Sequence, residues 1–598
     1  MIDKTEEIVL RGLPVSRGIG IGQPLFFSLG EADIPEVSIP SSGIEGEIER
    51  YRRALSLSRE DVERLQQLSL NDGPPEIVNI LGTHLEMLQD PVMTSGMEEK
   101  IRKLGKNPES IVLEVISEHK KRFRSIKDGY FQERVRDIID VSRRVLGHLF
   151  PMQRMRLGAV PPGSIILAHD LVPSDTVEAT MQIGAFVTAS GGITSHAAII
   201  ARAKGIPYVA HIDIKLFKRF DQINAVIVDG SQGIVIVNPA PDTLKKYQVL
   251  KKGQLQNFRL MQNAAHLKGE TIDGYRVRIF ANLEGTKQID YVLKHGAAGV
   301  GLVRTEYLLF PRKRFPSEEE QTAVYKKMTL RLGKNRPLII RLFDIGGDKK
   351  FDFDPSSVDS HYFRAIGHEP NPALGCRAIR FLMRFSHLLD LQLRAILRAS
   401  AFGNIHILIP MISDISELRY VRSRIAKLSK ELRRQGFKIP RSVPVGCMIE
   451  VPSSALLCDE LAKSADFLSV GTNDLVQYVL ASDRWNNDMT SHFYTPAHPS
   501  ILRLLRMIIA SSNRFKKPLL LCGESASDPL LIPLLLGLGI RDFSVAARTI
   551  PLVKHVIRKW RILDACQLAE QALEYSCAED LKRFLEERVA ALDMHKVF

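Results

Sequence analysis

One histidine stands in a segment whose composition suits phosphoryl chemistry. His196 lies in GGITSHAAIIARAKGIP, residues 191–207, after two glycines and two small hydroxyl residues. Thr194 and Ser195 are good helix N-cap residues, and the small and aliphatic residues that follow suit a helix. A helix N-terminus favours an anion, and a neutral imidazole is a nucleophile, so a phosphoryl group on His196 would lie on a prepared site. The alternative is an ordinary turn histidine.

The chain beyond residue 270 alternates strand-like and helical stretches, which predicts a TIM (β/α)8 barrel. We identify eight strand candidates: VRIFANL, GVGLVRTEYL, PLIIRLFDIGG, IHILIPMI, PVGCMIEVP, FLSVGTNDL, PLLLCGES and DFSVAA. Eight such units in roughly 300 residues are typical of this barrel, whose active site lies at the C-terminal ends of its strands. An open doubly wound sheet is the alternative.

Arginines gather at or near these strand ends. Arg304 and Arg341 end two strands, Arg484 follows the sixth strand, and Arg377 lies in a loop that opens a helix. A guanidinium group can donate two parallel hydrogen bonds to the oxygens of a phosphate or carboxylate. A single arginine of this kind is usually a surface or salt-bridge residue, but several at one barrel mouth predict a small anion with more than one charge.

Carboxylates and a thiol also stand at strand ends. Glu450 and Asp474 follow adjacent apolar strands, and Mg²⁺ is usually held by carboxylates together with waters and substrate oxygens. The alternative for both is a structural role in ion pairs with the arginines; Glu306 and Asp344 also follow strands. Cys522 ends the seventh strand and is either a reactive thiol or a buried structural cysteine.

The residues before the barrel show two patterns. Residues 44–150 repeat apolar residues at three- and four-residue steps, which predicts a helical bundle. Strand-like segments flank it, so we expect an α/β domain of residues 1–43 and 151–238 into which the bundle is inserted. Residues 239–270 suit a polar linker helix, and residues 271–598 form the predicted barrel domain.

The composition of the 598-residue chain narrows its class. The N-terminus lacks the apolar core of a signal peptide, and the longest apolar stretch, residues 529–540, is too short to span a bilayer. Six scattered cysteines without a Cys-x-x-Cys pair argue against a zinc site and fit a reducing cytoplasm. The net charge of +14 comes without a basic tail, so we expect neither a nucleic acid nor a membrane as partner.

Several motifs together resemble one enzyme family. GGITSHAAIIAR is similar to the phosphohistidine signature of the phosphoenolpyruvate-utilising enzymes. The barrel motifs resemble those of Enzyme I of the bacterial phosphoenolpyruvate:sugar phosphotransferase system: VGLVRTEYL, IRLFDIGGDK, NPALGCRAIR, LRAILRASAFG, IEVPSSA, SVGTNDLVQY and CGESASD. The resemblance extends over essentially the whole chain. It departs at Ile193, where many relatives have another residue, at Cys376, often tryptophan, and in the basic net charge.

The resemblance implies a role for each matching residue. His196 would be phosphorylated on Nε2, and Cys522 would protonate the enolpyruvate carbon. Glu450 and Asp474 would bind Mg²⁺. Phosphoenolpyruvate would be held by Arg304, Arg341, Arg377, Asn473, Asp474 and Arg484.

The same resemblance implies partners and a movement. The helical insert would dock the phosphocarrier protein HPr, pyruvate would be the product, and the barrel would form a homodimer. The phosphohistidine domain would swivel between the barrel and HPr about the linker helix.

The sequence disfavours two rival interpretations and leaves a third open. Pyruvate phosphate dikinases and phosphoenolpyruvate synthases carry an ATP-binding domain, but no Gly-rich nucleotide loop precedes His196. The nitrogen-regulatory paralogue adds an N-terminal sensory domain, for which we expect no space. A regulatory phosphoprotein that does not serve sugar uptake would have identical chemistry.

Overall fold

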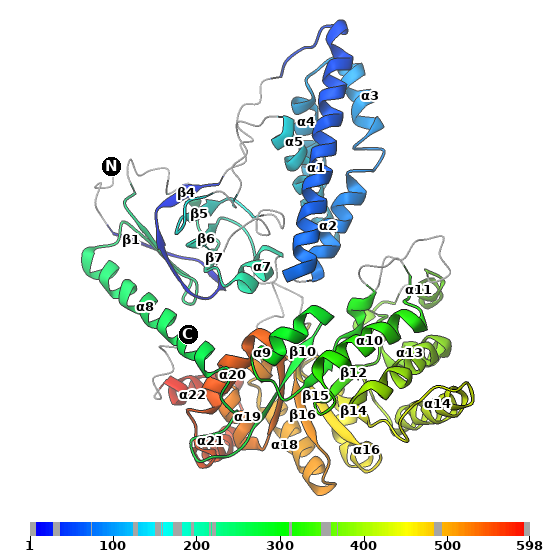
Figure 1. Cartoon of the computed structure of the whole chain (residues 1–598). Coiled ribbons are helices and arrows are strands. Elements are labelled where there is room, and N and C mark those ends of the chain that lie inside the picture. Colours follow the sequence, from blue (N-terminus) through cyan, green and yellow to red (C-terminus); the bar gives the residue numbers. More distant parts are fainter. Residues whose placement is uncertain are drawn as a thin grey trace. The chain divides into compact units, whose positions relative to one another are not determined.

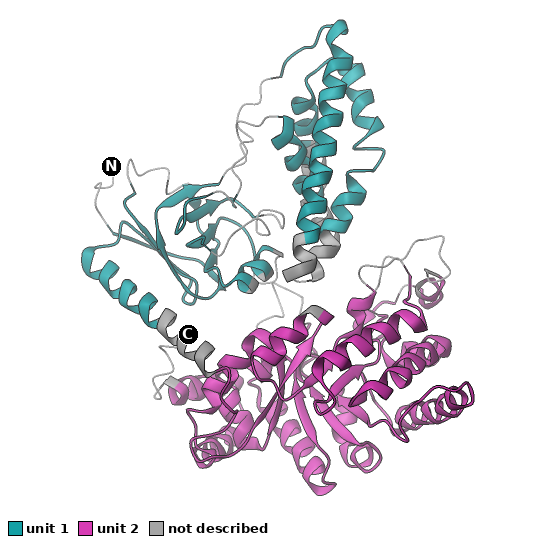
Figure 2. Cartoon of the chain, in the orientation of Figure 1, with its two compact units in different colours: residues 1–255, 596–598 teal, residues 256–595 magenta. Residues whose placement is uncertain are grey.

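The computed structural model of the chain divides into two compact units, residues 1–255 with 596–598, and residues 256–595 (Figure 2). The structure describes residues 7–27, 36–72, 75–123, 129–149, 157, 160–171, 182–192, 196–214, 217, 223–309, 314–347, 360–367, 369–483 and 493–590.

The α/β part of the first unit contains two sheets. One has the strand order β1–β9–β8–β3 and is antiparallel, and the other has the order β2–β7–β6–β5–β4, with only the β2–β7 pair antiparallel. Strands β5 to β8 are buried at every residue, because apolar side chains cover both faces. The strands are β1 (Ile8–Arg11), β2 (Leu13–Ser16), β3 (Ile19–Gly22), β4 (Pro24–Phe26), β5 (Ile165–Ala168), β6 (Ala185–Thr188), β7 (Tyr208–Ala210), β8 (Val226–Asp229) and β9 (Ile234–Val237).

Helices occupy the segment between β4 and β5, as the periodicity of residues 44–150 predicts. Their apolar faces form one cluster in which Tyr51, Leu65 and Val145 are buried. The Tyr51 hydroxyl donates a hydrogen bond of 2.6 Å to the Met93 carbonyl, so the buried ring leaves no polar atom unsatisfied. The helices are α1 (Ile44–Asp72), α2 (Pro75–Met87), α3 (Ser95–Leu104), α4 (Pro108–Phe123) and α5 (Gly129–Leu149).

The polar segment after β9 is helical. Helix α8 spans Pro241–Ala264 (Figure 1). The boundary between the two units, at residues 255 and 256, falls inside this helix.

The second unit is a closed barrel, which confirms the TIM fold and excludes the open sheet. Strands β10 to β17 pair in parallel in chain order, and β10 also pairs with β17, so the sheet has no free edge. All eight strands lie inside the segments identified from the sequence. They are β10 (Arg278–Leu283), β11 (Val300–Val303), β12 (Leu338–Arg341), β13 (Ile405–Ile409), β14 (Val445–Ile449), β15 (Phe467–Gly471), β16 (Leu519–Cys522) and β17 (Asp542–Ala546).

Helices surround the barrel, and side chains fill its interior. Phe280, Met448 and Phe467 belong to the buried interior cluster. Local sequence signals start two of the helices, because Ser317 with Glu320 and Asp414 with Glu417 form capping boxes. The helices are α9 (Ile289–Lys294), α10 (Glu318–Leu332), α11 (Ser360–Ile366), α12 (Ile379–Arg384), α13 (Ser386–Ala399), α14 (Ile415–Arg434), α15 (Pro452–Leu456), α16 (Cys458–Ser464), α17 (Thr472–Leu480), α18 (Pro499–Arg514), α19 (Ile532–Leu538), α20 (Ile550–Ile557), α21 (Ile562–Glu574) and α22 (Ala578–Ala590).

The apolar stretch at residues 529–540 contains α19, a helix of 7 residues. Among the described residues, no helix has the length and apolar character needed to cross a membrane.

Candidate active site

The histidine segment turns at a glycine and then forms a helix. Helix α7 (His196–Lys204) begins at His196, which confirms the predicted helix; the His196 side chain, Thr194 and Ser195 lie outside the described part. Gly191 has φ +124°, and a Cβ there would lie 2.6 Å from the Tyr208 hydroxyl, so this position requires glycine. A Cβ at Gly192 would meet open space, so only the first glycine is needed for the turn itself.

Arg341 lies at the end of β12 inside a pair of carboxylates. Its Nη2 donates to Glu306 at 2.9 Å, and its Nη1 lies 3.3 Å from Asp344. Burial opposes the charge of Arg341, but Glu306, Asp344 and Glu450 outweigh burial and raise its pKa further above its ordinary value. Its Nε is buried and has no hydrogen-bond partner among the described residues. This orphaned N–H is a donor that an anionic oxygen can satisfy.

Arg377 is buried, and acceptor side chains surround its guanidinium. It is 2% exposed, and its Nε and Nη2 donate to the two oxygens of Asp344 at 2.9 and 3.2 Å. Its Nη2 also lies 3.1 Å from Asp474, and its Nη1 donates to the Tyr478 hydroxyl at 3.2 Å. Arg377 therefore joins the ends of β12 and β15 through carboxylates that the sequence had placed at separate strand ends.

Glu450 is buried at the end of β14 among other acids. The Met411 N–H donates to its Oε1 at 2.6 Å. Burial, together with the carboxylates of Asp474 and Asp344, raises the pKa of Glu450 to about 8. The carboxylates gathered here, Glu306, Asp344, Glu450 and Asp474, outnumber the two buried guanidinium groups.

Arg304 is the most open of the described site arginines. It follows β11, its Nη1 lies 3.4 Å from Glu284, and its guanidinium lies 5.0 Å from the ring centre of Tyr307. Its side chain is 38% exposed, so a ligand can reach it. Arg484 lies outside the described residues.

Asn473 and Cys522 link the ends of β15 and β16. The Asn473 side chain accepts a hydrogen bond of 3.0 Å from the Glu524 N–H, and Thr472 donates to the Cys522 carbonyl at 2.9 Å. The Cys522 thiol is buried in the barrel interior, 3.3 Å from the Ser469 hydroxyl. Burial raises its pKa to about 11, so the thiol keeps its proton at neutral pH.

Two features of the site escaped the sequence analysis. Tyr478 contacts Arg377 and donates to the Ala373 carbonyl at 2.6 Å; its spacing of four residues from Asp474 on α17 was the available signal. Met411 and Ala378 have φ +55°, although neither is glycine, and they lie beside Glu450 and Arg377. Backbone strain of this kind is stored at functional sites and leaves no mark in composition.

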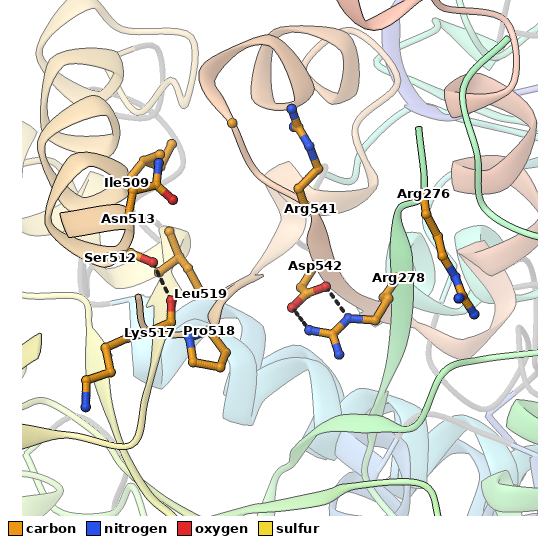
Figure 3. A pocket seen from close by; sticks show the side chains of 11 residues that line it. Arg276, Arg278, Ile509, Ser512, Asn513, Lys517, Pro518, Leu519, Arg541 and Asp542 are labelled. Atoms are coloured by element: carbon orange, nitrogen blue, oxygen red, sulfur yellow. Dashed lines mark hydrogen bonds and ion pairs between the residues drawn. The ribbon is translucent and has the colours of Figure 1, made fainter. Parts of the chain in front are cut away.

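A cavity of about 350 Å³ opens at the opposite, N-terminal end of the strands (Figure 3). Arg278 donates to both oxygens of Asp542 there, at 2.7 and 2.5 Å, and Arg541 donates to main-chain carbonyls. The charges of Arg278 and Asp542 in this cavity therefore already pair with each other. This cavity is therefore not the expected active site, because reactions in this barrel fold take place at the C-terminal ends of the strands.

Comparison with known proteins decides the family. Models of the phosphoenolpyruvate-utilising enzymes match in three parts: the N-terminal domain at residues 11–134, the mobile domain at 160–233 and the PEP-binding domain at 259–562. Phosphoenolpyruvate-protein phosphotransferases of Listeria innocua and Bacillus subtilis are 34% and 35% identical to the chain, over 97% of it and 99% of each relative. The chain belongs to the phosphoenolpyruvate-protein phosphotransferase family.

A solution structure of Enzyme I (nEIt) is 32% identical to the matched part of this chain, covers 41% of this chain and 98% of its own, and has a TM-score of 0.34. The phosphoenolpyruvate-protein phosphotransferase assignment makes the chain an enzyme that uses phosphoenolpyruvate in phosphoryl transfer. His196 falls in the matched mobile domain, and the barrel residues of this site fall in the matched PEP-binding domain.

Proposed function

We propose that His196 takes the phosphoryl group of phosphoenolpyruvate and passes it to HPr, with release of pyruvate, as the first step of a sugar phosphotransferase system. The observation that carries the substrate site is Arg341, whose buried Nε has no partner among the described residues while its other nitrogens face Glu306 and Asp344. A guanidinium held in this way keeps its Nε–H donor available for an anion.

The remaining substrate contacts come from the same barrel end. Arg304 is partly exposed and follows β11, the strand that pairs with the Arg341 strand, and Arg484 and Asn473 complete the proposed set. Arg377 adds positive charge near the phosphate and holds Asp474 in place through its 3.1 Å contact. Together they neutralise the phosphate and carboxylate of the substrate and leave its phosphorus open to the imidazole.

Glu450 and Asp474 would hold Mg²⁺. Two carboxylates with substrate oxygens and waters suit this ion, and the excess of buried acids over guanidinium groups fits a cation. Among the described residues no group of three or more acids, histidines or cysteines is placed to hold a metal, so the remaining ligands would come from substrate and water. When bound, the ion neutralises charge on the phosphate.

Cys522 would supply the proton that completes pyruvate formation. As the bond between phosphorus and the enol oxygen breaks, the phosphoryl group goes to His196 Nε2 and its bonding electrons stay on the enolate. The enolate carbon then takes the thiol proton of Cys522, which becomes a thiolate. A pKa of about 11 keeps that proton in place until the enolate forms.

Partner binding follows from the domain arrangement we propose. The helical insert, residues 44–150, would dock HPr, and the α/β domain of residues 1–43 and 151–238 would move on the linker, residues 239–270. The barrel domain, residues 271–598, would form the homodimer, and the scattered unpaired cysteines suit a cytoplasmic enzyme.

Labelled phosphoenolpyruvate tests this function. The full chain, incubated with it and Mg²⁺, should form an acid-labile, base-stable phosphoprotein that passes its label to HPr and releases pyruvate. His196→Ala should abolish labelling, whereas His266→Ala, which removes an exposed histidine, should not. Labelling of His196→Ala at the wild-type level would exclude His196 as acceptor. A label that never reaches HPr, or any sugar-system component, would favour a regulatory phosphoprotein.

A further inference from the structure

Gln392 lies behind the substrate arginines and touches two of the loops that carry them. It is fully buried on α13, a helix outside the strands. Its Oε1 accepts a hydrogen bond of 2.9 Å from the Phe343 N–H, in the loop two residues after Arg341. Its Nε2 donates to the Thr305 hydroxyl at 3.2 Å, in the residue directly after Arg304.

The Thr305 hydroxyl connects Gln392 to the end of β12. It donates to the Arg341 carbonyl at 2.9 Å, so it accepts from Gln392 and donates to β12 at the same time. The turn after β11 is thereby tied to the last residue of β12. Glu306 is the next residue in that turn and binds the Arg341 guanidinium. Hydrogen bonds from this one turn therefore fix the position of both the main chain and the guanidinium of Arg341.

The direction of these hydrogen bonds is fixed by the surrounding groups. The second hydrogen of Gln392 Nε2 points to the Tyr325 hydroxyl at 3.4 Å, and that hydroxyl donates onward to Gln321 at 3.2 Å. Only an amide offers an acceptor to Phe343 N–H and two donors to the hydroxyls. All of these groups are buried, so water cannot replace a lost partner at no cost.

We infer that Gln392 is a positioning residue for phosphoenolpyruvate binding, acting through Thr305 and Phe343 on Arg304 and Arg341. This inference rests on the proposed function, because it takes those arginines as the substrate site. Gln392 touches no substrate itself. Its loss leaves the arginines present but lets the two strand ends shift against each other, and a small misplacement of a binding group weakens substrate use strongly.

Steady-state kinetics of the full chain with varied phosphoenolpyruvate test the inference. Gln392→Met keeps the side-chain length without its hydrogen bonds, and Thr305→Val keeps the shape without the hydroxyl. Each should raise KM for phosphoenolpyruvate by about tenfold, or about 1.4 kcal/mol, while kcat changes by less than about threefold. Gln392→Glu should not restore the wild-type KM, because a carboxylate offers no donor to Thr305 or Tyr325.

Thr329→Val is the matched control. Thr329 is also buried, and its hydroxyl donates to the Tyr325 carbonyl at 2.8 Å, within its own helix α10 and not to either strand end. Its KM should stay within about twofold of wild type. An equal rise in Thr329→Val would show general loosening of the barrel and overturn the inference, as would a wild-type KM in Thr305→Val.

Arg341→Ala, measured beside these variants, separates the two claims. If Arg341→Ala loses phosphoenolpyruvate use while Thr305→Val and Gln392→Met keep the wild-type KM, the positioning role fails and the substrate site stands. If Arg341→Ala itself keeps the wild-type KM, the proposed site is wrong and the positioning role fails with it. Should Gln392→Met not fold, Thr305→Val carries the test alone.

Discussion

Asp344 and Arg377 form a buried pair joined by two hydrogen bonds, Nε to Oδ1 at 2.9 Å and Nη2 to Oδ2 at 3.2 Å. Asp344 is fully buried, and Arg377 is 2% exposed. A planar guanidinium makes this two-point contact, whereas a lysine ammonium cannot. The pair is therefore sensitive to a substitution that preserves charge.

Arg377→Lys should reduce kcat/KM for phosphoenolpyruvate at least tenfold and destabilise the protein by about 3 kcal/mol, because Asp344 and Asp474 lose a buried partner. Denaturant unfolding and steady-state kinetics measure the two effects. Arg398→Lys is the control: Arg398 pairs with Glu318 and Glu319 on the outside of the barrel and should cost less than about 1 kcal/mol. Equal losses in both variants would contradict a special role for the buried pair.

Glu450→Gln should raise the Mg²⁺ concentration needed for half-maximal activity by at least tenfold, because the amide is a far weaker ligand for this ion than a carboxylate. Activity titrated with Mg²⁺ at saturating phosphoenolpyruvate measures the change. Glu417→Gln alters another buried acid, one that accepts hydrogen bonds from Ser413 and Asp414 at the start of α14, and should leave the titration unchanged. An unshifted curve for Glu450→Gln would remove Glu450 from the metal site.

Cys522→Ser should slow pyruvate formation at least tenfold with little change in phosphoenolpyruvate binding, since a hydroxyl is a much weaker acid than a thiol. Cys447→Ser, which changes a buried thiol of β14, is the control and should keep wild-type turnover. Normal turnover with lost binding in Cys522→Ser would mean that the thiol only packs.

The pH dependence of stability tests the burial of the same thiol. The folded-state pKa of Cys522 is raised from 9.0 to about 11. The protonated thiol's contribution to the free energy of unfolding is therefore complete below pH 9 and is lost as pH rises through 11. Between pH 8 and pH 10, wild type should lose about 1 kcal/mol more unfolding free energy than Cys522→Ser. Parallel denaturant melts of the two proteins give the difference, and identical pH slopes would show that the thiol ionises freely in the folded chain.

Gly471→Ala should displace the proposed metal carboxylate. Gly471 has an ordinary φ of −93°, but a Cβ there would lie 2.4 Å from Glu450 Oε2. We expect a weaker Mg²⁺ response, in the direction of Glu450→Gln. Gly285→Ala, two residues after β10, adds a Cβ that meets nothing within 4 Å and should leave the Mg²⁺ titration as it is. If both alanines act alike, the close approach to Glu450 is not the cause.

The sequence alone was enough to predict the barrel fold and to identify the family. Apolar runs such as those of β13 and β14 are local signals, and their number and spacing specify eight strand–helix units. The short motifs around His196 and Cys522 also identify the family without any contact information.

Only the tertiary structure decided how the site is held together. Arg377 lies 33 residues from Asp344 and 101 from Tyr478, and Gln392 lies 87 from Thr305, so no local pattern connects them. Their pairing depends on the fold of the barrel, whose closed sheet and surrounding helices bring segments distant in sequence to one place and remove them from water. The same closure gives Glu450 its pKa of about 8, because a carboxylate in a sequence has no neighbours until the chain folds around it.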